Sequence, residues 1–260
     1  MVNKSGKIIC VTSVKGGVGK TTTLLNLAGI YSLEKYRVLI LDLDLFAGAI
    51  AVNLDIRNKK DIFMLIDSIS NNRFTTLGDY VSVYNKNIDV IASPKDPRQA
   101  LKIDGKYLPV VFDIAKREYD VILVDTNHVL DEVNLTILDY SYMSLFIISN
   151  DIADLKNMKS IVSIFKDADK TNYLICLNNS KDSSKVYMSL FDIKNVIKKN
   201  VSYVIDKSFY IKNIDKFVLN GEILTLNKSI NRFHSSDINN LKKLALDLID
   251  DKHGKEVDHE

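Results

Sequence analysis

A glycine-rich segment near the N-terminus has the residue types that bind a polyphosphate. It reads Lys15-Gly-Gly-Val-Gly-Lys-Thr-Thr22 and lies between an apolar run at 7–13 and a run with helical apolar spacing at 21–33. A strand, a glycine-rich turn and a helix in this order let backbone N–H groups converge on phosphate oxygens at the positive end of a helix. The Lys20 ammonium would lie along the β- and γ-phosphates, and the Thr21 hydroxyl would hold Mg²⁺. The nucleotide-binding residues expected in this loop are Gly16, Gly17, Val18, Gly19, Lys20, Thr21 and Thr22.

Three carboxylates follow apolar runs that read as buried strands. Asp42 and Asp44 end the run at 37–43, and their spacing of two residues directs both side chains to the same side of a strand, beside the phosphate loop. Asp125 ends a second apolar run, which downstream of a phosphate loop is expected to supply a carboxylate near Mg²⁺. A pair of aspartates that only closes a strand in a turn is the alternative for Asp42 and Asp44.

The elements that must position these residues alternate along the chain. Continuously apolar runs such as VILVD and LFIIS are typical of strands that are buried on both faces of a parallel sheet. The alternation predicts an α/β fold, a doubly wound, mostly parallel sheet of about seven strands, with ligands at the carboxyl ends of the strands. The expected strands are 7–13, 37–43, 88–92, 120–125, 143–149, 172–178 and 201–205. The expected helices are 21–33, 61–70, 105–118, 131–140, 153–167, 189–199, 209–219 and 236–250.

Bulk properties fit one domain at residues 1–251, followed by a polar tail at 252–260. Apolar residues make up 46% and charged residues 26% of the 260 positions, as in soluble globular proteins. The net charge of +2 is too small to indicate nucleic-acid binding by itself. We expect no signal peptide and no integral membrane association, because the first strand begins at once and no apolar run approaches the ~20 residues of a membrane span. Cys10 and Cys176 lie in apolar runs, which favours packing in a reducing cytosol over a metal or cluster site.

The phosphate loop departs from the common pattern at two adjacent positions. Val14 stands where a glycine is usual, and a second lysine, Lys15, precedes Gly16. A KGGxGKT loop of this kind resembles the deviant Walker A family of P-loop NTPases, the ParA/MinD-type ATPases. The resemblance implies ATP and Mg²⁺ as cofactors and an ATP-dependent homodimer, in which Lys15 crosses the interface to the partner's nucleotide. Lys15 has no evident use within its own loop.

The same resemblance assigns roles to residues beyond the loop. It implies catalytic roles for Lys15, Lys20 and Asp44, with Asp44 orienting the attacking water. It implies a metal site at Thr21, Asp42 and Asp125.

Two further residues are candidates for the nucleotide base. Asn178 ends a strand where relatives carry an asparagine that faces adenine, and Asp206 lies in a stretch similar to the family's I-P-x-D but without its proline. A turn or a helix cap explains either residue nearly as well.

The segment after Asp125 also differs from the family. Relatives place a proline shortly after this aspartate, whereas the chain reads Thr126-Asn127-His128. The difference concerns how this segment moves on hydrolysis and leaves the metal site unaffected. We interpret His128 as a solvated or locally bonded loop histidine, because phosphoryl transfer depends mostly on positioning and charge.

Within the family, the segments at 42–48 and 88–97 are most similar to the CpaE/TadZ group of pilus-assembly and polar-localisation ATPases. This resemblance implies a slowly hydrolysing switch that positions a pilus, secretion or polar assembly through a protein partner. It also implies a cytoplasmic protein that its partner recruits to the cell pole or the inner face of the membrane.

A ParA-like DNA-segregation ATPase, which binds DNA non-specifically through lysines such as Lys198, Lys199, Lys212 and Lys216, is the alternative. Their scatter among aspartates favours solvated helix faces over a DNA-binding stripe. The amphipathic run at 238–249 carries only Lys242 and Lys243, so we expect it to pack against the domain rather than bind a membrane.

Overall fold

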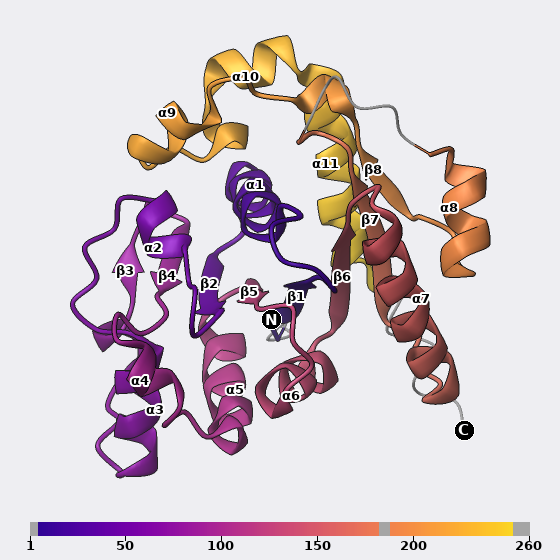
Figure 1. The fold of residues 1–260 in the computed structure, drawn as a ribbon. Helices are drawn as coiled ribbons and strands as arrows, with labels where there is room; N and C mark the ends of the chain where they lie inside the picture. Colours follow the sequence, from indigo (N-terminus) through magenta and orange to yellow (C-terminus); the bar gives the residue numbers. More distant parts are fainter. Residues whose placement is uncertain (1–4, 182–187, 252–260) are drawn as a thin grey trace.

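A twisted sheet of eight strands forms the centre of the molecule (Figure 1). The structure, a computed structural model, describes residues 5–181 and 188–251. Within these residues the strand order is β3-β4-β2-β5-β1-β6-β7-β8, parallel throughout except that β3 pairs antiparallel with β4. The strands are β1 (Lys7–Thr12), β2 (Val38–Leu43), β3 (Ser82–Val83), β4 (Ile88–Ile91), β5 (Val121–Thr126), β6 (Met143–Ile148), β7 (Tyr173–Asn178) and β8 (Tyr203–Ile205).

The predicted parallel α/β sheet is confirmed, but the expected number of about seven strands was one too low. The additional strand, β3, has two residues at the edge of the sheet and is too short to produce a hydrophobic pattern. All seven predicted strands are present, with ends that differ by one or two residues.

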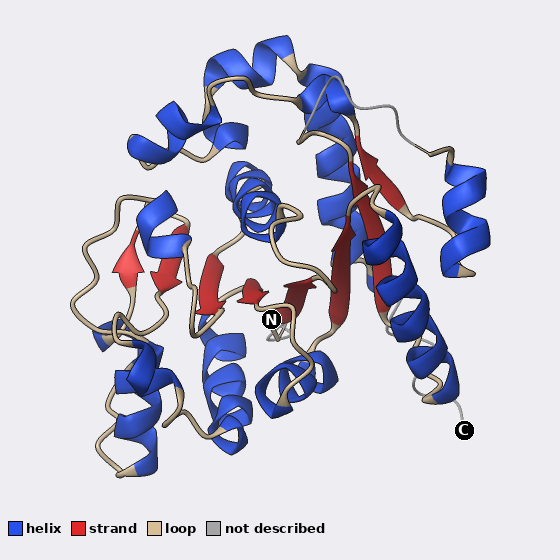
Figure 2. Cartoon of the chain, in the orientation of Figure 1, coloured by secondary structure: helices blue, strands red, loops and turns tan. Residues whose placement is uncertain are grey.

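Helices cover both faces of the sheet (Figure 2). They are α1 (Lys20–Leu33), α2 (Ile50–Asn53), α3 (Ile62–Ser70), α4 (Pro97–Ala100), α5 (Leu108–Glu118), α6 (Glu132–Tyr140), α7 (Ile152–Asp167), α8 (Leu190–Ile197), α9 (Ile214–Leu219), α10 (Lys228–Phe233) and α11 (Ser235–Leu248). Short 3-10 turns are η1 (Leu77–Asp79), η2 (Gly105–Tyr107), η3 (Lys207–Phe209) and η4 (Leu224–Leu226). The predicted helix at 105–118 divides into η2 and α5, and the one predicted at 209–219 begins only at Ile214.

The sheet separates two hydrophobic cores. Ile8 and Cys10 of β1 pack into the core beneath α3, α5, α6, α7 and α8, whereas Ile9 and Val11 pack into the core beneath α1 and α11. Successive side chains of the apolar run at residues 8–11 therefore point to opposite faces of the sheet and pack against two layers of helices. All six residues of β2, of β5 and of β6 are buried, which holds the carboxyl ends of these strands in fixed register.

Helix α1 is buried on nearly all sides, although its sequence reads as helical spacing with one apolar face. The sheet covers one side of the helix, and η4 and α11 cover the other. The Tyr31 hydroxyl donates to the Ala245 carbonyl over 2.5 Å, and the Thr225 hydroxyl donates to the Asn26 carbonyl over 2.8 Å. The helix that begins at the phosphate loop is thus held by packing from both directions.

The C-terminal helix packs against the domain, as predicted. Ile238, Leu241, Leu244 and Leu248 of α11 are buried, and the Tyr142 hydroxyl donates to the Asp250 carbonyl just beyond the helix. An amphipathic helix whose apolar face is already covered offers no such face to a lipid surface. In the described part of the chain, no helix has both the length and the apolar character needed to cross a bilayer.

Gly29 tests how closely α1 packs against η4. A Cβ atom at this position would overlap the Thr225 hydroxyl and lie 2.8 Å from Cγ2 of Ile223. We expect Gly29→Ala to lower the free energy of unfolding by about 1–3 kcal/mol, because overpacking exceeds the gain of about 1 kcal/mol in helix propensity. Urea unfolding measures the difference. Gly78→Ala, whose Cβ would lie 3.7 Å from its nearest neighbour, is the control, and equal effects of the two changes would contradict the close packing.

Candidate functional site

The predicted phosphate loop connects the carboxyl end of β1 to the first turn of α1. Gly17 and Gly19 have φ values of 73° and 98°, in the left-handed region that favours glycine. No side chain caps the N-terminus of α1, and its first turn contains no acidic residue. The N–H groups and the positive end of the helix dipole are therefore left for an anionic ligand.

Lys20 and Thr21 begin α1, and their surroundings also indicate a site for an anionic ligand. Lys20 is only 8% exposed. Among the described residues, its ammonium group makes no hydrogen bond or ion pair. Burying an ammonium without a partner is costly, so this charge fits a phosphate group that binds beside it. The Thr21 hydroxyl donates to Oδ2 of Asp125 over 2.6 Å, which brings two of the three predicted metal ligands into contact.

The third predicted ligand, Asp42, lies on the strand next to Asp125. The two residues are paired in the register of β2 and β5, and both are almost fully buried. Oδ2 of Asp42 accepts hydrogen bonds from the Ile50 N–H (3.1 Å) and the Ser93 hydroxyl (3.3 Å). Oδ1 of Asp42 and Oδ1 of Asp125 are buried, and neither has a hydrogen-bond partner among the residues that the structure describes.

Burial changes the acidity of both carboxyl groups. Burial, reinforced by the nearby Asp125, raises the pKa of Asp42 from 3.8 to about 8. Burial raises the pKa of Asp125 to about 7, against the opposing effects of the Thr21 hydrogen bond and the Lys20 charge. Both shifts mean that the site disfavours two negative charges unless a cation neutralises them.

These residues fit a magnesium ion, provided that a nucleotide supplies the remaining ligands. Carboxylate and hydroxyl oxygens are the donors that Mg²⁺ accepts, usually one or two from protein together with phosphate and water. In the described residues, no three His, Cys, Asp or Glu side chains come together closely enough to hold a metal by themselves. Bound Mg²⁺ would supply charge neutralisation for the phosphates, and Thr21, Asp42 and Asp125 would hold it.

Asp44 follows β2 and is partly exposed at the same edge of the sheet. Its charge raises the pKa values of both Asp42 and Asp125, so it lies near the buried pair. Its carbonyl accepts from the Ala47 N–H over 3.2 Å, which shapes the turn after the strand. Its role toward water stays a prediction.

Lys15 has a partner within its own chain, which the sequence did not reveal. Its ammonium lies 3.3 Å from Oδ1 of Asp151, and the side chains are 44% and 39% exposed. Asp151 also caps α7, where it accepts from the Ala153 and Asp154 N–H groups. These N–H groups and Lys15 lower the pKa of Asp151. An exposed ion pair of this kind contributes little energy, so Lys15 can exchange Asp151 for another anion at small cost.

The segment after Asp125 is fixed by side-chain hydrogen bonds in place of the expected proline. Oδ1 of Asn127 accepts from the Val129 N–H (2.7 Å) and from Nδ2 of Asn134 (2.6 Å) in α6. His128, between these anchors, is exposed, as interpreted from the sequence. Its ring nevertheless lies against the phosphate loop, because a Cβ atom on Gly16 would be 3.6 Å from Cε1 and 3.7 Å from Nδ1 of His128.

A cavity of about 230 Å³ adjoins the other end of the phosphate loop, and both polar and apolar side chains line it. The predicted residues Gly19, Thr22 and Asn178 line it, and Nδ2 of Asn178 donates to the Val18 carbonyl over 2.9 Å. Asp206 does not line the cavity; it is exposed and caps η3 by accepting from the Ser208 N–H.

Sequence reasoning missed several residues of this cavity. Lys181 lines it and donates to the Gly17 carbonyl, and Asn26, Ser180, Phe209 and Tyr210 complete much of its wall. A larger open cavity of about 880 Å³ lies beside β3 and has none of the predicted site residues in its lining. Only the smaller of these two cavities adjoins the glycine-rich loop and the predicted site residues.

Comparison with known proteins agrees with this geometry. The family model AAA_31, described as an AAA domain, matches residues 6–176. The chain belongs to the ParA/MinD-type AAA_31 ATPase superfamily. The septum site-determining protein MinD of Helicobacter pylori is 21% identical over 157 residues, which cover 60% of this chain and 58% of that protein. The chain thus matches less than two thirds of that relative's length.

Two solved structures of superfamily members share the fold. A ParA family ATPase from Chlorobium tepidum has a TM-score of 0.79 at 20% identity, with 93% of this chain and 99% of that chain covered. MinD from Pyrococcus horikoshii, solved as a complex with Mg-ADP, has a TM-score of 0.76 at 21% identity, with 98% and 100% covered. The fold of this ATPase superfamily therefore extends over nearly the whole chain.

The raised pKa of Asp42 predicts that its ionised carboxylate lowers the stability of the nucleotide-free protein. Because its pKa is raised, its contribution to stability is present below about pH 4 and is lost as the pH rises through about 8. We expect Asp42→Asn to raise the free energy of unfolding of the nucleotide-free protein by about 1–3 kcal/mol, the cost of a buried group without a partner. The gain should grow between about pH 5 and pH 9. Urea unfolding at both pH values measures it.

Asp44→Asn is the matched control, because Asp44 is partly exposed and should give no such gain. A loss of stability in Asp42→Asn at the higher pH would contradict the description of a strained carboxyl pair.

Proposed function

We propose that this protein is an ATP-binding, slowly hydrolysing switch that forms a homodimer with ATP and Mg²⁺. In this proposal the loop at 16–22 binds the phosphates, with Lys20 beside the β- and γ-phosphates. Thr21, Asp42 and Asp125 hold Mg²⁺, and Asp44 orients the attacking water. Asn178 and the cavity beside it receive adenine, whereas the exposed position of Asp206 supports a cap more than a base contact.

The observation that carries the proposal is a set of exposed apolar side chains around the phosphate loop. Phe46 follows β2, Val129 and Leu130 follow β5, and Ile152 begins α7 after β6, each more than 40% exposed. The strand order β2-β5-β1-β6 makes these loops neighbours of the phosphate loop, which follows β1. Apolar residues gathered at one edge are typical of a protein–protein interface.

Lys15 lies within this edge and supports an interface that includes the nucleotide. Its partner Asp151 immediately precedes Ile152, and the ion pair is exposed. A dimer that covers this edge would bring the Lys15 ammonium to the partner's phosphates, which are stronger anions than one carboxylate. The proposed switch therefore replaces Lys15–Asp151 with a contact between subunits.

We propose that the ATP-bound dimer recognises a protein partner of a pilus, secretion or polar assembly. The segments at 42–48 and 88–97 support this assignment through their similarity to the CpaE/TadZ group. The packed C-terminal helix argues against direct lipid binding. A surface that exists only in the dimer would couple partner affinity to the nucleotide. Such a partner would recruit a cytoplasmic protein to the pole or the inner face of the membrane.

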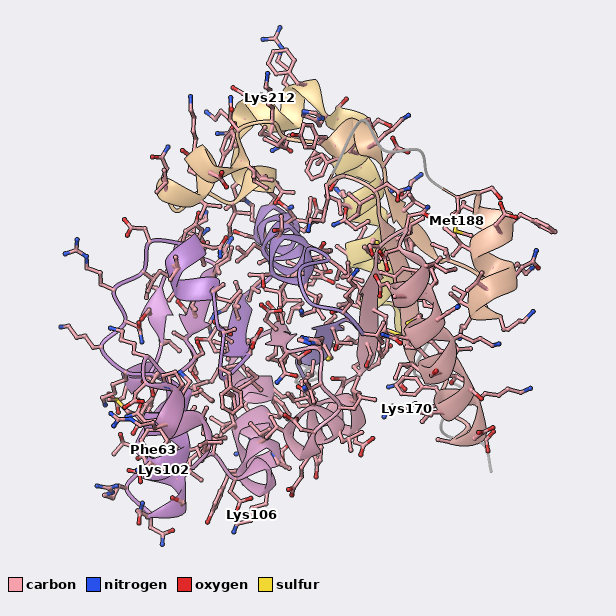
Figure 3. The ribbon with its side chains drawn as sticks, in the orientation of Figure 1. Phe63, Lys102, Lys106, Lys170, Met188 and Lys212 are labelled. Atoms are coloured by element: carbon pink, nitrogen blue, oxygen red, sulfur yellow. The ribbon has the colours of Figure 1, made fainter. Side chains whose placement is uncertain are left out.

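DNA segregation is the second candidate, because a ParA family ATPase shares the fold. The candidate lysines do not support a continuous DNA-binding stripe. Lys199 lies over the ring of Tyr173, the first residue of β7, at 3.7 Å and therefore at the amino edge of the sheet. Lys212 follows β8 and lies at the opposite edge, beside α9 and α10 (Figure 3).

The dimer is the most direct test of the proposed function. We expect ATP with Mg²⁺ to double the mass of Asp44→Ala, in which hydrolysis is blocked, and ADP to leave it monomeric. Adding Lys15→Ala should abolish the doubling while nucleotide still binds, and Lys20→Ala should lose nucleotide affinity. Light scattering with parallel nucleotide titrations measures all of these. Lys212→Ala in the Asp44→Ala background is the matched control and should still form the dimer.

A monomeric mass under every nucleotide condition would contradict the proposed ATP-dependent dimerisation. Binding to unrelated DNA that requires ATP and weakens steeply with salt would favour DNA segregation over a protein partner.

A further inference from the structure

His128 occupies a position that the proposed roles of the phosphate loop leave unexplained. Its Nδ1–Cε1 edge faces Gly16, the residue after Lys15, and the side chain is exposed to solvent at the carboxyl edge of the sheet. A freely solvated histidine needs no particular neighbour. This ring leaves room for little more than a methyl group at Gly16, in a loop whose backbone is expected to bind phosphate.

The backbone on both sides of His128 is held in place. Asn127, before it, is anchored by its bonds to the Val129 N–H and to Asn134. Asn134 also donates to the Val129 carbonyl, after it, and Asp131 caps α6 by accepting from the Asn134 N–H over 2.9 Å. Because these bonds tie the segment to the first turn of α6, the ring is delivered to Gly16 by a fixed backbone.

The other polar side chains of this segment already have partners. The Thr126 hydroxyl donates to the Val11 carbonyl over 3.3 Å, and Asn127 and Asp131 have the bonds described above. No hydrogen bond to the His128 imidazole is found within residues 5–181 and 188–251. The Asn127 amide nitrogen and the His128 imidazole are therefore the groups of this segment with donor capacity left for a ligand. Of the two, only the His128 ring has atoms within 4 Å of a Cβ atom placed on Gly16.

The location of Gly16 indicates which part of a nucleotide the ring would meet. The base cavity is lined by Gly19, Thr22 and Asn178, at the helical end of the phosphate loop, and Gly16 is not part of that lining. His128 also follows closely after Asp125, which contacts Thr21 on the metal side. A polyphosphate that extends from the cavity across the loop would present its terminal phosphate at the end where Gly16 and His128 lie.

We propose that His128 is a positioning residue that donates a hydrogen bond to the terminal phosphate of ATP bound to its own subunit. The inference rests on the proposed nucleotide switch and adds a residue that distinguishes ATP from ADP. It also replaces our interpretation of His128 as a solvated loop histidine. Since segments after the metal-side aspartate report the γ-phosphate in nucleotide switches, a contact here would couple the state of the nucleotide to the exposed Val129 and Leu130.

The test compares ATP and ADP affinities, each with excess Mg²⁺, in the full-length protein. Calorimetric titration should be done at concentrations where light scattering reports a monomer, so that dimerisation does not contribute. We expect His128→Ala to weaken ATP binding about tenfold, as for loss of one hydrogen bond to a charged group, and to leave ADP binding unchanged. His128→Gln keeps an N–H donor of similar reach and should recover most of the ATP affinity.

Two results would overturn the inference while leaving the proposed function intact. Unchanged affinity for both nucleotides in His128→Ala would mean that the ring is only solvated. Equal loss of ATP and ADP affinity would mean that the ring supports the loop without touching the terminal phosphate. Failure of the parent protein to bind either nucleotide would reject the proposed function, and the His128 inference with it. Unfolding curves of the parent and both variants show whether each is folded.

Discussion

Two buried carboxyl groups on neighbouring strands, without enough hydrogen-bond partners among the described residues, are the constraint on which the proposed site depends. Asp42 and Asp125 end neighbouring strands in register, and each keeps one buried oxygen without a partner. Burial is the main cause of their raised pKa values, about 8 for Asp42 and about 7 for Asp125, and the charge of Asp125 adds to the shift at Asp42. A cation would allow both carboxyl groups to stay ionised by neutralising their charge. The two groups keep their positions because the strands that carry them, β2 and β5, are buried throughout.

The rest of the fold holds these groups and the phosphate loop against each other. Helix α1 carries Lys20 and Thr21, and its outer side is covered by η4 and α11. Because packing holds the helix in place, its first turn and the Lys20 ammonium keep the positions in which they can bind an anion, even when none is bound. Preorganised charge of this kind costs stability in the free protein, and binding the opposite charges recovers it.

What the sequence could predict follows from the range of the interactions involved. Runs buried on both faces, such as residues 121–124, are apolar at every position and can be recognised without knowing their neighbours. The glycine-rich loop is recognisable for a similar reason, since its chemistry depends on local backbone conformation. The missed elements β3, of two residues, and α2 and α4, of four residues each, are too short to show a period, and contacts made elsewhere in the fold determine them.

Contacts between segments that are distant in the sequence could not be predicted either. No local pattern shows that Asp151 pairs with Lys15, that Lys181 reaches the Gly17 carbonyl, or that His128 lies against Gly16. Asp206 illustrates the opposite problem, because a short motif resemblance and a turn cap use the same residue type. Such ambiguities are resolved only when the strands bring their carboxyl ends to one edge.

Proton release on nucleotide binding tests the central claim most directly. Carboxyl groups with pKa values of about 7 and about 8 are substantially protonated at neutral pH, and Asp42 and Asp125 would have to lose those protons to hold a metal ion. Calorimetry of Mg·ATP binding near pH 7, in buffers of different ionisation enthalpy, measures the number released. The account predicts release of about one proton, reduced in Asp42→Asn. Tight ATP binding that neither requires Mg²⁺ nor releases a proton would contradict it.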